Sequence, residues 1–472
     1  MLRKIVLLRG HERLRVAWQS RAFSMAASTL DQSIKVQGAE FDESYHPVRV
    51  PGPARFALSP QKAVGFDYRA LALVDLPVPG VPRVGATYAV RAKFKDQEAI
   101  ERLKQDRADE VVGVFADPTI TAFPAVYCGN AAVGTDRDAW QQLGGAALRK
   151  AGLTGKKVRV AVVDTGIDAK VVPVAGGWGP TKGYKPGSVS PPQHGTMCAF
   201  DVRIAAPDAQ ILDYALLQSA KAEEGWAGFL SDALAAFADL IDLLQKEPGP
   251  LVVNNSWGMF NRSQDEPIGS PGNYSANPDH PFNQIVGSLV AAGADVCFAA
   301  GNCGDGKCKD VRCGKHDVGP GQSIHGANSH PDVITVAAVT VDQRRLGYSS
   351  QGPGGLFARK PDLAGYSHFL GSKVEGADEP DSGTSTASPV VAGVVAALRQ
   401  RLDPGKVSPA SLKSLLQRSA KDLGGKGWDR DLGYGVIDAA AALKSLDSGT
   451  GKKKAASVRT SPRKGTKKKW RN

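Results

Sequence analysis

Short apolar runs alternate with amphipathic segments between residues 157 and 339, and this alternation limits the fold more than any other feature of the chain. Each apolar run has the composition of a buried strand, whereas the amphipathic segments carry apolar residues every three or four positions, as in a helix with one buried face. Strands that alternate with helices form right-handed crossovers and a mainly parallel sheet. We therefore predict an α/β fold, a doubly wound sheet with helices on both faces. The predicted strands are 157–163, 209–217, 251–253, 296–299 and 333–339, and the predicted helices are 226–244 and 282–292.

A serine stands at the start of a further apolar helix. Residues 382–389 are mostly small and run directly into the apolar segment 390–402. Because proline is tolerated only in the first turn of a helix, Pro389 predicts that Ser385 lies just before or at the helix N-terminus. Backbone amides there stabilise negative charge on a nearby oxygen. A serine in this place is also explained as the cap of a core helix, so Ser385 alone does not define a function.

Two upstream residues supply what a serine nucleophile needs. Asp164 follows an apolar strand directly, and His194 opens a predicted helix. A hydroxyl group reacts at neutral pH only when a base takes its proton, and the base needs a carboxylate to fix its tautomer. Asp164, His194 and Ser385 provide these roles in the chain order aspartate, histidine, serine, which is also the order in subtilisin.

At this point the sequence resembles the subtilisin-like serine peptidases, the subtilase family, over about residues 150 to 445. The matching motifs are Val-Val-Asp164-Thr-Gly, His194-Gly-Thr and Gly-Thr-Ser385-x-Ala-x-Pro. The resemblance implies a serine endopeptidase that forms an acyl-enzyme intermediate, acts on proteins or peptides and requires no cofactor for catalysis. It also implies that Asn302, at the end of Ala299-Ala300-Gly301-Asn302, binds the oxyanion.

The resemblance further implies a backbone edge that pairs with substrate. The family places this edge at the segment Ser256-Trp257-Gly258, and we expect Ala300 and Gly301 to border the same site. The ring of Trp257 is expected to narrow a subsite or to stack in it.

Two other functions fit parts of the sequence. One is a catalytically silent binding protein on a peptidase scaffold, recruited through its basic tail, although such a protein has no chemical need for the complete set of catalytic groups. The other is an esterase of the α/β-hydrolase type. That type requires the order serine, acid, histidine and a Gly-x-Ser-x-Gly motif, whereas here Ala387 follows Ser385 and His194 precedes it.

We expect four regions along the chain. They are a basic N-terminal segment (1–27), an N-terminal region (28–125), the peptidase domain (126–447) and a tail rich in Lys and Arg (448–472). Within the second region, residues 87–118 have the pattern of a strand, a charged helix and another strand, which predicts a small α+β unit. This unit resembles part of the family's inhibitory prosegment and suggests a zymogen; a permanent N-terminal domain fits equally.

The ends of the chain account for the basic net charge of +12: residues 451–472 contribute +10 and residues 1–22 contribute +5, so the remainder carries −3. The tail composition predicts disorder, and its lysines offer a contact for nucleic acid or an anionic membrane. At the N-terminus the apolar run 5–8 is shorter than a signal-peptide core, and no stretch is long enough to span a membrane. A transit peptide or a reading frame that starts at Met25 would explain residues 1–27. We expect a monomer and favour the cytoplasm, with a secreted or organellar location as the alternative.

Three of the six cysteines, Cys303, Cys308 and Cys313, lie close together after Asn302, with His316 beyond them. A zinc site of three cysteines and one histidine is one interpretation, although the spacing is not that of paired CxxC motifs. One disulfide and a free thiol is another. Calcium, which many subtilases use for stability, is a third, with Asp305, Asp310 and Asp317 as candidate ligands.

Overall fold

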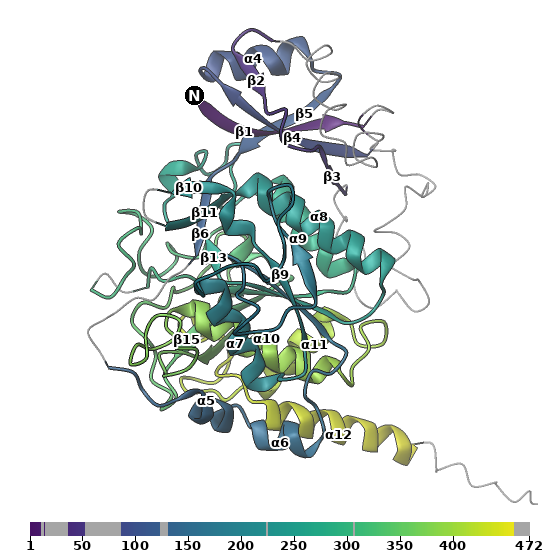
Figure 1. Ribbon diagram of the computed structural model, residues 1–472, viewed down its shortest axis with the longest axis vertical. Coiled ribbons are helices and arrows are strands. Elements are labelled where there is room, and N and C mark those ends of the chain that lie inside the picture. Colours follow the sequence, from purple (N-terminus) through teal and green to yellow (C-terminus); the bar gives the residue numbers. More distant parts are fainter. Residues whose placement is uncertain are drawn as a thin grey trace, which may run out of the picture.

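The computed structural model describes residues 1–10, 14, 36–51, 86–122, 131–222, 225–304 and 307–456. A seven-stranded sheet forms the centre of the larger part of the molecule (Figure 1), and every neighbouring pair of its strands is parallel. The doubly wound α/β fold is therefore confirmed. In spatial order the strands are β16 (Leu363–Tyr366), β15 (Ile334–Val339), β14 (Asp295–Ala299), β12 (Leu251–Asn255), β7 (Arg159–Val163), β9 (Gln210–Tyr214) and β8 (Gly176–Trp178).

Helices cover both faces of this sheet because its strands are apolar on both sides. In β12, for example, Val252 belongs to the hydrophobic core on one face, whereas Leu251 and Val253 belong to the core on the other. The first face carries α7 (His194–Ala205), α10 (Thr384–Arg399) and α11 (Pro409–Ser419), and the second carries α8 (Leu230–Lys246) and α9 (Pro281–Ala291). Helices α5 (Asp136–Gln142), α6 (Gly145–Lys150) and α12 (Ala439–Ala456) lie together at the end of the molecule far from the N-terminus (Figure 1).

An N-terminal α+β unit packs on the opposite end (Figure 1). The strand, helix and strand predicted over 87–118 are present as β4 (Thr87–Phe94), α4 (Gln97–Asp106) and β5 (Val111–Ala116). Strands β1 (Leu2–Arg9), β2 (Ala39–Phe41) and β3 (Val48–Val50) complete an antiparallel sheet in which β1 lies between β4 and β5. Residues 2–9, which we assigned to a separate basic N-terminal segment, thus form a strand of this unit. The apolar run 5–8 is buried because it is the middle of this strand.

A second, small sheet lies between the N-terminal unit and the large sheet. It consists of β10 (Ala220–Ala222), β11 (Gly225–Phe229), β6 (Thr119–Ala122) and β13 (Trp257–Gly258), in this spatial order and with antiparallel pairing. The sequence predicted that Trp226 begins the long helix, and this is wrong. Trp226 lies in β11 and pairs with Lys221 of β10, and residues 227–229 pair with β6, a segment about a hundred positions earlier in the chain. Strand pairing therefore overrides the local helical pattern.

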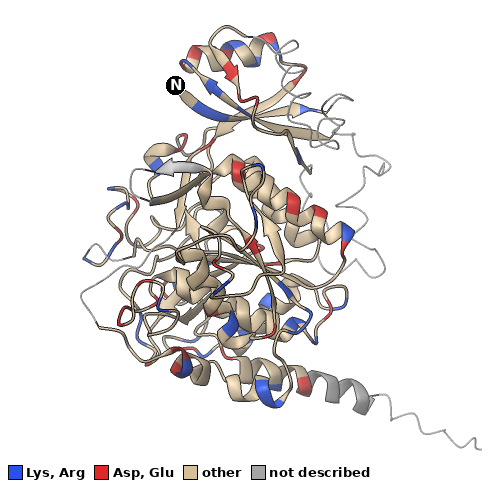
Figure 2. Ribbon diagram, in the orientation of Figure 1, with Lys and Arg blue, Asp and Glu red and all other residues tan. Residues whose placement is uncertain are grey.

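Charged residues lie mainly on the outer helices and loops (Figure 2). Helix α12 continues to Ala456, beyond the boundary that we placed at residue 448. The rest of the basic tail, 457–472, lies outside the described residues, and so does the prediction that it is disordered. Across the described ranges, no helix combines the length and the apolar character that crossing a membrane would require.

Candidate active site

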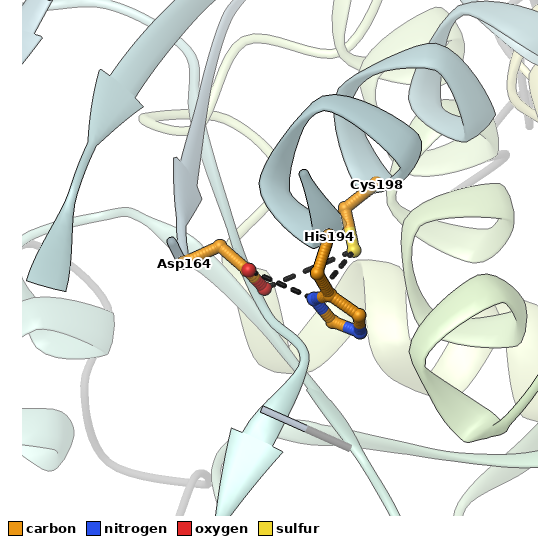
Figure 3. Close-up of side chains that lie close together, drawn as sticks. All are labelled: Asp164, His194 and Cys198. Carbon is orange, nitrogen blue, oxygen red and sulfur yellow. Dashed lines mark hydrogen bonds and ion pairs between the residues drawn. The ribbon is translucent and has the colours of Figure 1, made fainter. Parts of the chain in front are cut away.

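Asp164 and His194 form a buried hydrogen-bonded pair (Figure 3). Asp164 follows the last residue of β7, and His194 is the first residue of α7, so the strand end and the helix start bring the side chains together. The His194 Nδ1 atom lies 2.8 Å from Asp164 Oδ1, and the backbone amide of Thr165 donates to the same carboxylate oxygen at 2.7 Å. Since a carboxylate only accepts, Nδ1 carries the proton and Nε2 is the basic nitrogen of the neutral imidazole.

The close approach of the helix to the strand depends on glycine. A Cβ atom added to Gly195 would lie 2.5 Å from the carbonyl oxygen of Gly166, closer than such atoms ever pack. The motif glycine after His194 therefore positions the imidazole beside Asp164.

Cys198 lies one helical turn after His194 and faces the pair (Figure 3). Its sulfur is 3.8 Å from Asp164 Oδ2 and 3.8 Å from His194 Nδ1, and 3.5 Å from the backbone oxygen of Ser385. Burial, and then the Asp164 carboxylate, raise the pKa of the Cys198 thiol well above its usual value. The group is therefore a protonated thiol that packs beneath the site, as expected for a small buried side chain, and not a nucleophile.

Ser385 is the second residue of α10 and is fully buried. Its Oγ donates to the backbone oxygen of Ser256 at 3.3 Å, and the Ser256 hydroxyl donates to the backbone oxygen of Ser385 at 3.0 Å. The start of α10 is thus joined directly to the segment that precedes β13. Because Cys198 touches Asp164, His194 and Ser385, the three residues predicted for catalysis lie around one point at the carboxyl end of the sheet.

Asn302 is held beside the same helix start. Its Oδ1 accepts hydrogen bonds from the Thr384 amide at 3.0 Å and from the Thr384 hydroxyl at 2.9 Å. The Thr384 hydroxyl in turn accepts from the amide of Gly301 at 3.1 Å. An amide N–H can only donate, so the Asn302 atom that faces it is the oxygen, and the orientation of the side chain follows. Gly301 has φ of 108°, a conformation that favours glycine, which explains the Gly-Asn pair in the motif.

The predicted substrate edge is already paired with a strand. In β13, Trp257 is opposite Ala122 and Gly258 is opposite Thr121, so β6 lies along this edge, with β11 on its other side. The expectation for the Trp257 ring is wrong. The ring is fully buried between Phe282 and Phe298, at centroid distances of 5.8 and 5.4 Å, so only the backbone of Trp257 belongs to the edge. Ala300 is also buried, at the end of β14.

The cysteine loop contains a disulfide between Cys303 and Cys313, and Cys308 is disulfide-bonded as well. Oxidised cysteines offer no thiolate, so these residues do not form the zinc site that we considered, and His316 is exposed. Of the residues considered for calcium, Asp310 pairs with Arg312 and Asp317 pairs with Arg262, and a calcium site stays a prediction. Asp305 lies outside the described residues.

A buried ionic network, which the sequence did not indicate, joins the N-terminal unit to α8. The Asp117 carboxylate accepts from the amide of Ser231 at 2.8 Å and from its hydroxyl at 2.9 Å, and thereby caps the helix. Arg91 donates to the Ser231 hydroxyl at 2.8 Å and pairs with Asp232. Burial raises the pKa of Asp117 to about 6.

Comparison with known proteins finds relatives of this chain. The model of the Subtilase family matches residues 155–435. This match covers more than half of the chain. Fervidolysin from Fervidobacterium pennivorans is 27% identical over 339 residues, 66% of this chain and 43% of that protein. The minor extracellular protease Epr from Bacillus subtilis (strain 168) is 26% identical over 361 residues, 72% of this chain and 48% of that protein.

The membrane-bound transcription factor site-1 protease from Homo sapiens is 33% identical over 182 residues, 36% of this chain and 16% of that protein. The chain thus spans less than half of the length of each of these three relatives.

Proposed function

This chain belongs to the subtilase family of serine peptidases, and from that premise we propose that it is an endopeptidase whose catalytic groups are Asp164, His194 and Ser385. The observation that carries the proposal is the buried contact of 2.8 Å between Asp164 and His194 Nδ1, which leaves Nε2 as the base. The place of Ser385 at the start of α10, beside the same Cys198 thiol, supports its role as the nucleophile.

The proposed reaction has two halves. The Ser385 hydroxyl attacks the peptide carbonyl while His194 Nε2 takes its proton, and the imidazolium then passes that proton to the leaving amine. A water molecule, activated by the same nitrogen, hydrolyses the resulting ester and frees Ser385. Asp164 keeps the imidazole oriented and stabilises its positive charge in both halves. The Asn302 amide and the Ser385 backbone N–H bind the oxyanion of each tetrahedral intermediate.

We also propose that the N-terminal unit occupies the active site as a prosegment. Strand β6 follows β5 directly and lies between β13 and β11, where an extended peptide would bind by adding a strand. The contacts of Arg91 and Asp117 with α8 support a stable docking of the unit in this position.

A fluorophosphonate probe, which phosphonylates an activated serine, tests the catalytic assignment. We expect labelling of the wild-type chain and none of Ser385→Ala or His194→Ala, together with loss of peptide hydrolysis. Ser388→Ala is the matched control, because Ser388 lies on the same helix and bonds to Asn254. Labelling that survives in Ser385→Ala, or is lost in Ser388→Ala, would contradict the assignment.

Intact-mass measurement tests the prosegment. The wild-type chain should acquire a new N-terminus between about Asp117 and Ala139, since β6 pairs with β13 and the residue before β13, Ser256, bonds to Ser385. Ser385→Ala should keep its full length, because an intramolecular cut needs the serine. An active wild-type chain that retains residues 28–118 would make the unit a permanent domain.

A further inference from the structure

Arg312 contacts the outer face of β6, whose two edges are paired with β11 and β13. Burial along β6 alternates, with Ile120 and Ala122 turned into the protein and Thr121 half-buried on the outer side. On that side, Arg312 Nη1 donates to the Thr121 hydroxyl at 3.2 Å, and Nη2 donates to the backbone oxygen of Ala122 at 3.1 Å. One guanidinium therefore binds both a backbone carbonyl and a side-chain hydroxyl of the strand in the cleft.

The guanidinium is held in place independently of β6. Asp310 accepts from Arg312 Nε at 2.9 Å and from Nη2 at 2.7 Å, and the Phe260 ring lies 4.1 Å beneath the guanidinium carbon. Such a bidentate pair and a stacked ring fix the plane of an arginine. The donors that face β6 are thus oriented before any strand binds.

The loop that carries Arg312 is tied to the active site. The Cys303–Cys313 disulfide closes it, and the amide of Asp310 donates to the backbone oxygen of Asn302 at 3.0 Å. These contacts hold Arg312 at a fixed position relative to the proposed oxyanion residue.

We propose that Arg312 forms a substrate-binding subsite that selects a hydroxyl-bearing residue, threonine or serine, at the position that Thr121 occupies. The inference rests on the proposed peptidase function and names a preference of that same site. Because Asp310 already neutralises the guanidinium, a neutral acceptor is favoured there and a carboxylate gains little. Valine has the shape of threonine but accepts no hydrogen bond, so it leaves the Nη1 donor without this partner.

Chromogenic peptides of sequence Thr-Ile-X-Ala-Phe-p-nitroanilide test the proposal, since they copy residues 119–123 with X in place of Thr121. With the wild-type chain we expect kcat/KM for X = Thr to exceed that for X = Val by about tenfold, as for a charge-assisted hydrogen bond at a half-exposed site. X = Ser should approach Thr, and X = Asp should not exceed it. Only chains in which β6 has left its place beside β13 hydrolyse these peptides. This fraction changes both kcat/KM values equally, so it cancels in their ratio.

Variants assign the preference to the arginine. Arg312→Ala should reduce the ratio of Thr to Val to about one, and Arg312→Lys should restore part of it, because a lysine keeps a charged donor without the fork. Arg344→Ala is the matched control. Arg344 pairs with Asp342 at the same spacing of two residues, in an exposed turn, and this variant should keep the wild-type ratio.

The possible outcomes distinguish a failure of the proposed subsite from a failure of the proposed peptidase function. Equal hydrolysis of the Thr and Val peptides by a wild-type chain that labels with fluorophosphonate would overturn the subsite alone, whether or not Arg312→Ala folds. A preference for Asp over Thr would overturn the stated selectivity for hydroxyl groups. A wild-type chain that neither labels nor hydrolyses any peptide would overturn the proposed function and, with it, the subsite.

Discussion

Replacement of Asn302 by alanine is the most direct measure of the proposed oxyanion site. The side chain is fully buried, and both hydrogen bonds from Thr384 go to its Oδ1, so the amide plane is fixed with Nδ2 as the donor. A donor aimed at the oxyanion acts on the transition state and not on the bound substrate. We therefore expect kcat to fall while KM stays nearly constant.

The variant Asn302→Ala is expected to lower both kcat and the stability of the protein. A side-chain oxyanion donor, as measured for the asparagine of subtilisin, contributes about 2.7–4 kcal/mol to the transition state, which corresponds to about a 100- to 1000-fold loss of kcat. The buried Thr384 amide also loses its acceptor in Asn302→Ala, and a donor left unpaired in this way costs about 1–3 kcal/mol of unfolding free energy. The Thr384 hydroxyl can rotate to another acceptor, so it adds less.

Two further variants separate these parts. Asn302→Asp keeps an oxygen for the Thr384 amide but removes the donor and adds a negative charge near the oxyanion. It should recover stability relative to Asn302→Ala and lose at least as much kcat. Thr384→Ser keeps both hydrogen bonds to Asn302 and serves as the matched control, with kcat near that of the wild type.

The assay is steady-state hydrolysis of a chromogenic peptide, with the melting temperature of each variant measured in parallel. Titration with a fluorophosphonate gives the concentration of active sites, so that kcat refers to functional protein. An Asn302→Ala variant that folds and keeps full kcat would refute the oxyanion assignment. A rise of KM at constant kcat would show that Asn302 stabilises the bound substrate and the transition state equally.

Three other outcomes follow from buried groups. Burial raises the pKa of Asp117 to about 6, so docking of the N-terminal unit should weaken by about 3 kcal/mol as the pH rises from about 4 through 6. Hydrogen exchange of the β5 amides measures this pH dependence, and Asp117→Asn should remove it. Arg399→Leu leaves Asp295 buried without its bidentate partner and should lower the free energy of unfolding by about 3–5 kcal/mol in urea titrations. The double variant Arg399→Leu/Asp295→Leu should recover most of the lost stability. Loss of the disulfide in Cys303→Ser/Cys313→Ser should cost about 3 kcal/mol by the loop-closure estimate and should lower the melting temperature in calorimetry; an unchanged melting temperature would contradict a stabilising bond.

The sequence predicted the sheet well because its signals are local. An apolar run followed by Asp164 specifies a strand end, and the spacing of apolar residues specifies the helix after it. Strand β1 was missed for the opposite reason. Its partners, β4 and β5, lie about eighty or more positions later, and a short apolar run such as 5–8 carries no sign of such distant pairing. The same limitation applies in part to β11, which contains Trp226, because residues 227–229 pair with the distant β6 while Trp226 pairs with the adjacent β10.

The disulfide bears on the compartment. Structural disulfides form and persist in oxidising environments, and reducing ones keep thiols free. The Cys303–Cys313 bond is of the kind that a secreted or organellar location allows, and the location of the protein stays a prediction.

The positions of the proposed catalytic residues and of the proposed selectivity residue are determined by different parts of the structure. His194 and Ser385 open helices that pack on the sheet, so the backbone that defines the fold also brings them together. Arg312 lies in a loop that a disulfide closes, it pairs with Asp310, and it contacts β6 from another part of the chain. The sequence places the cysteines and Asp310 near Arg312, but it does not indicate the contact with β6, so only the structure identifies this arginine. Loops of this kind can change without altering the sheet, and selectivity can therefore diverge within a family while its catalytic groups stay in place.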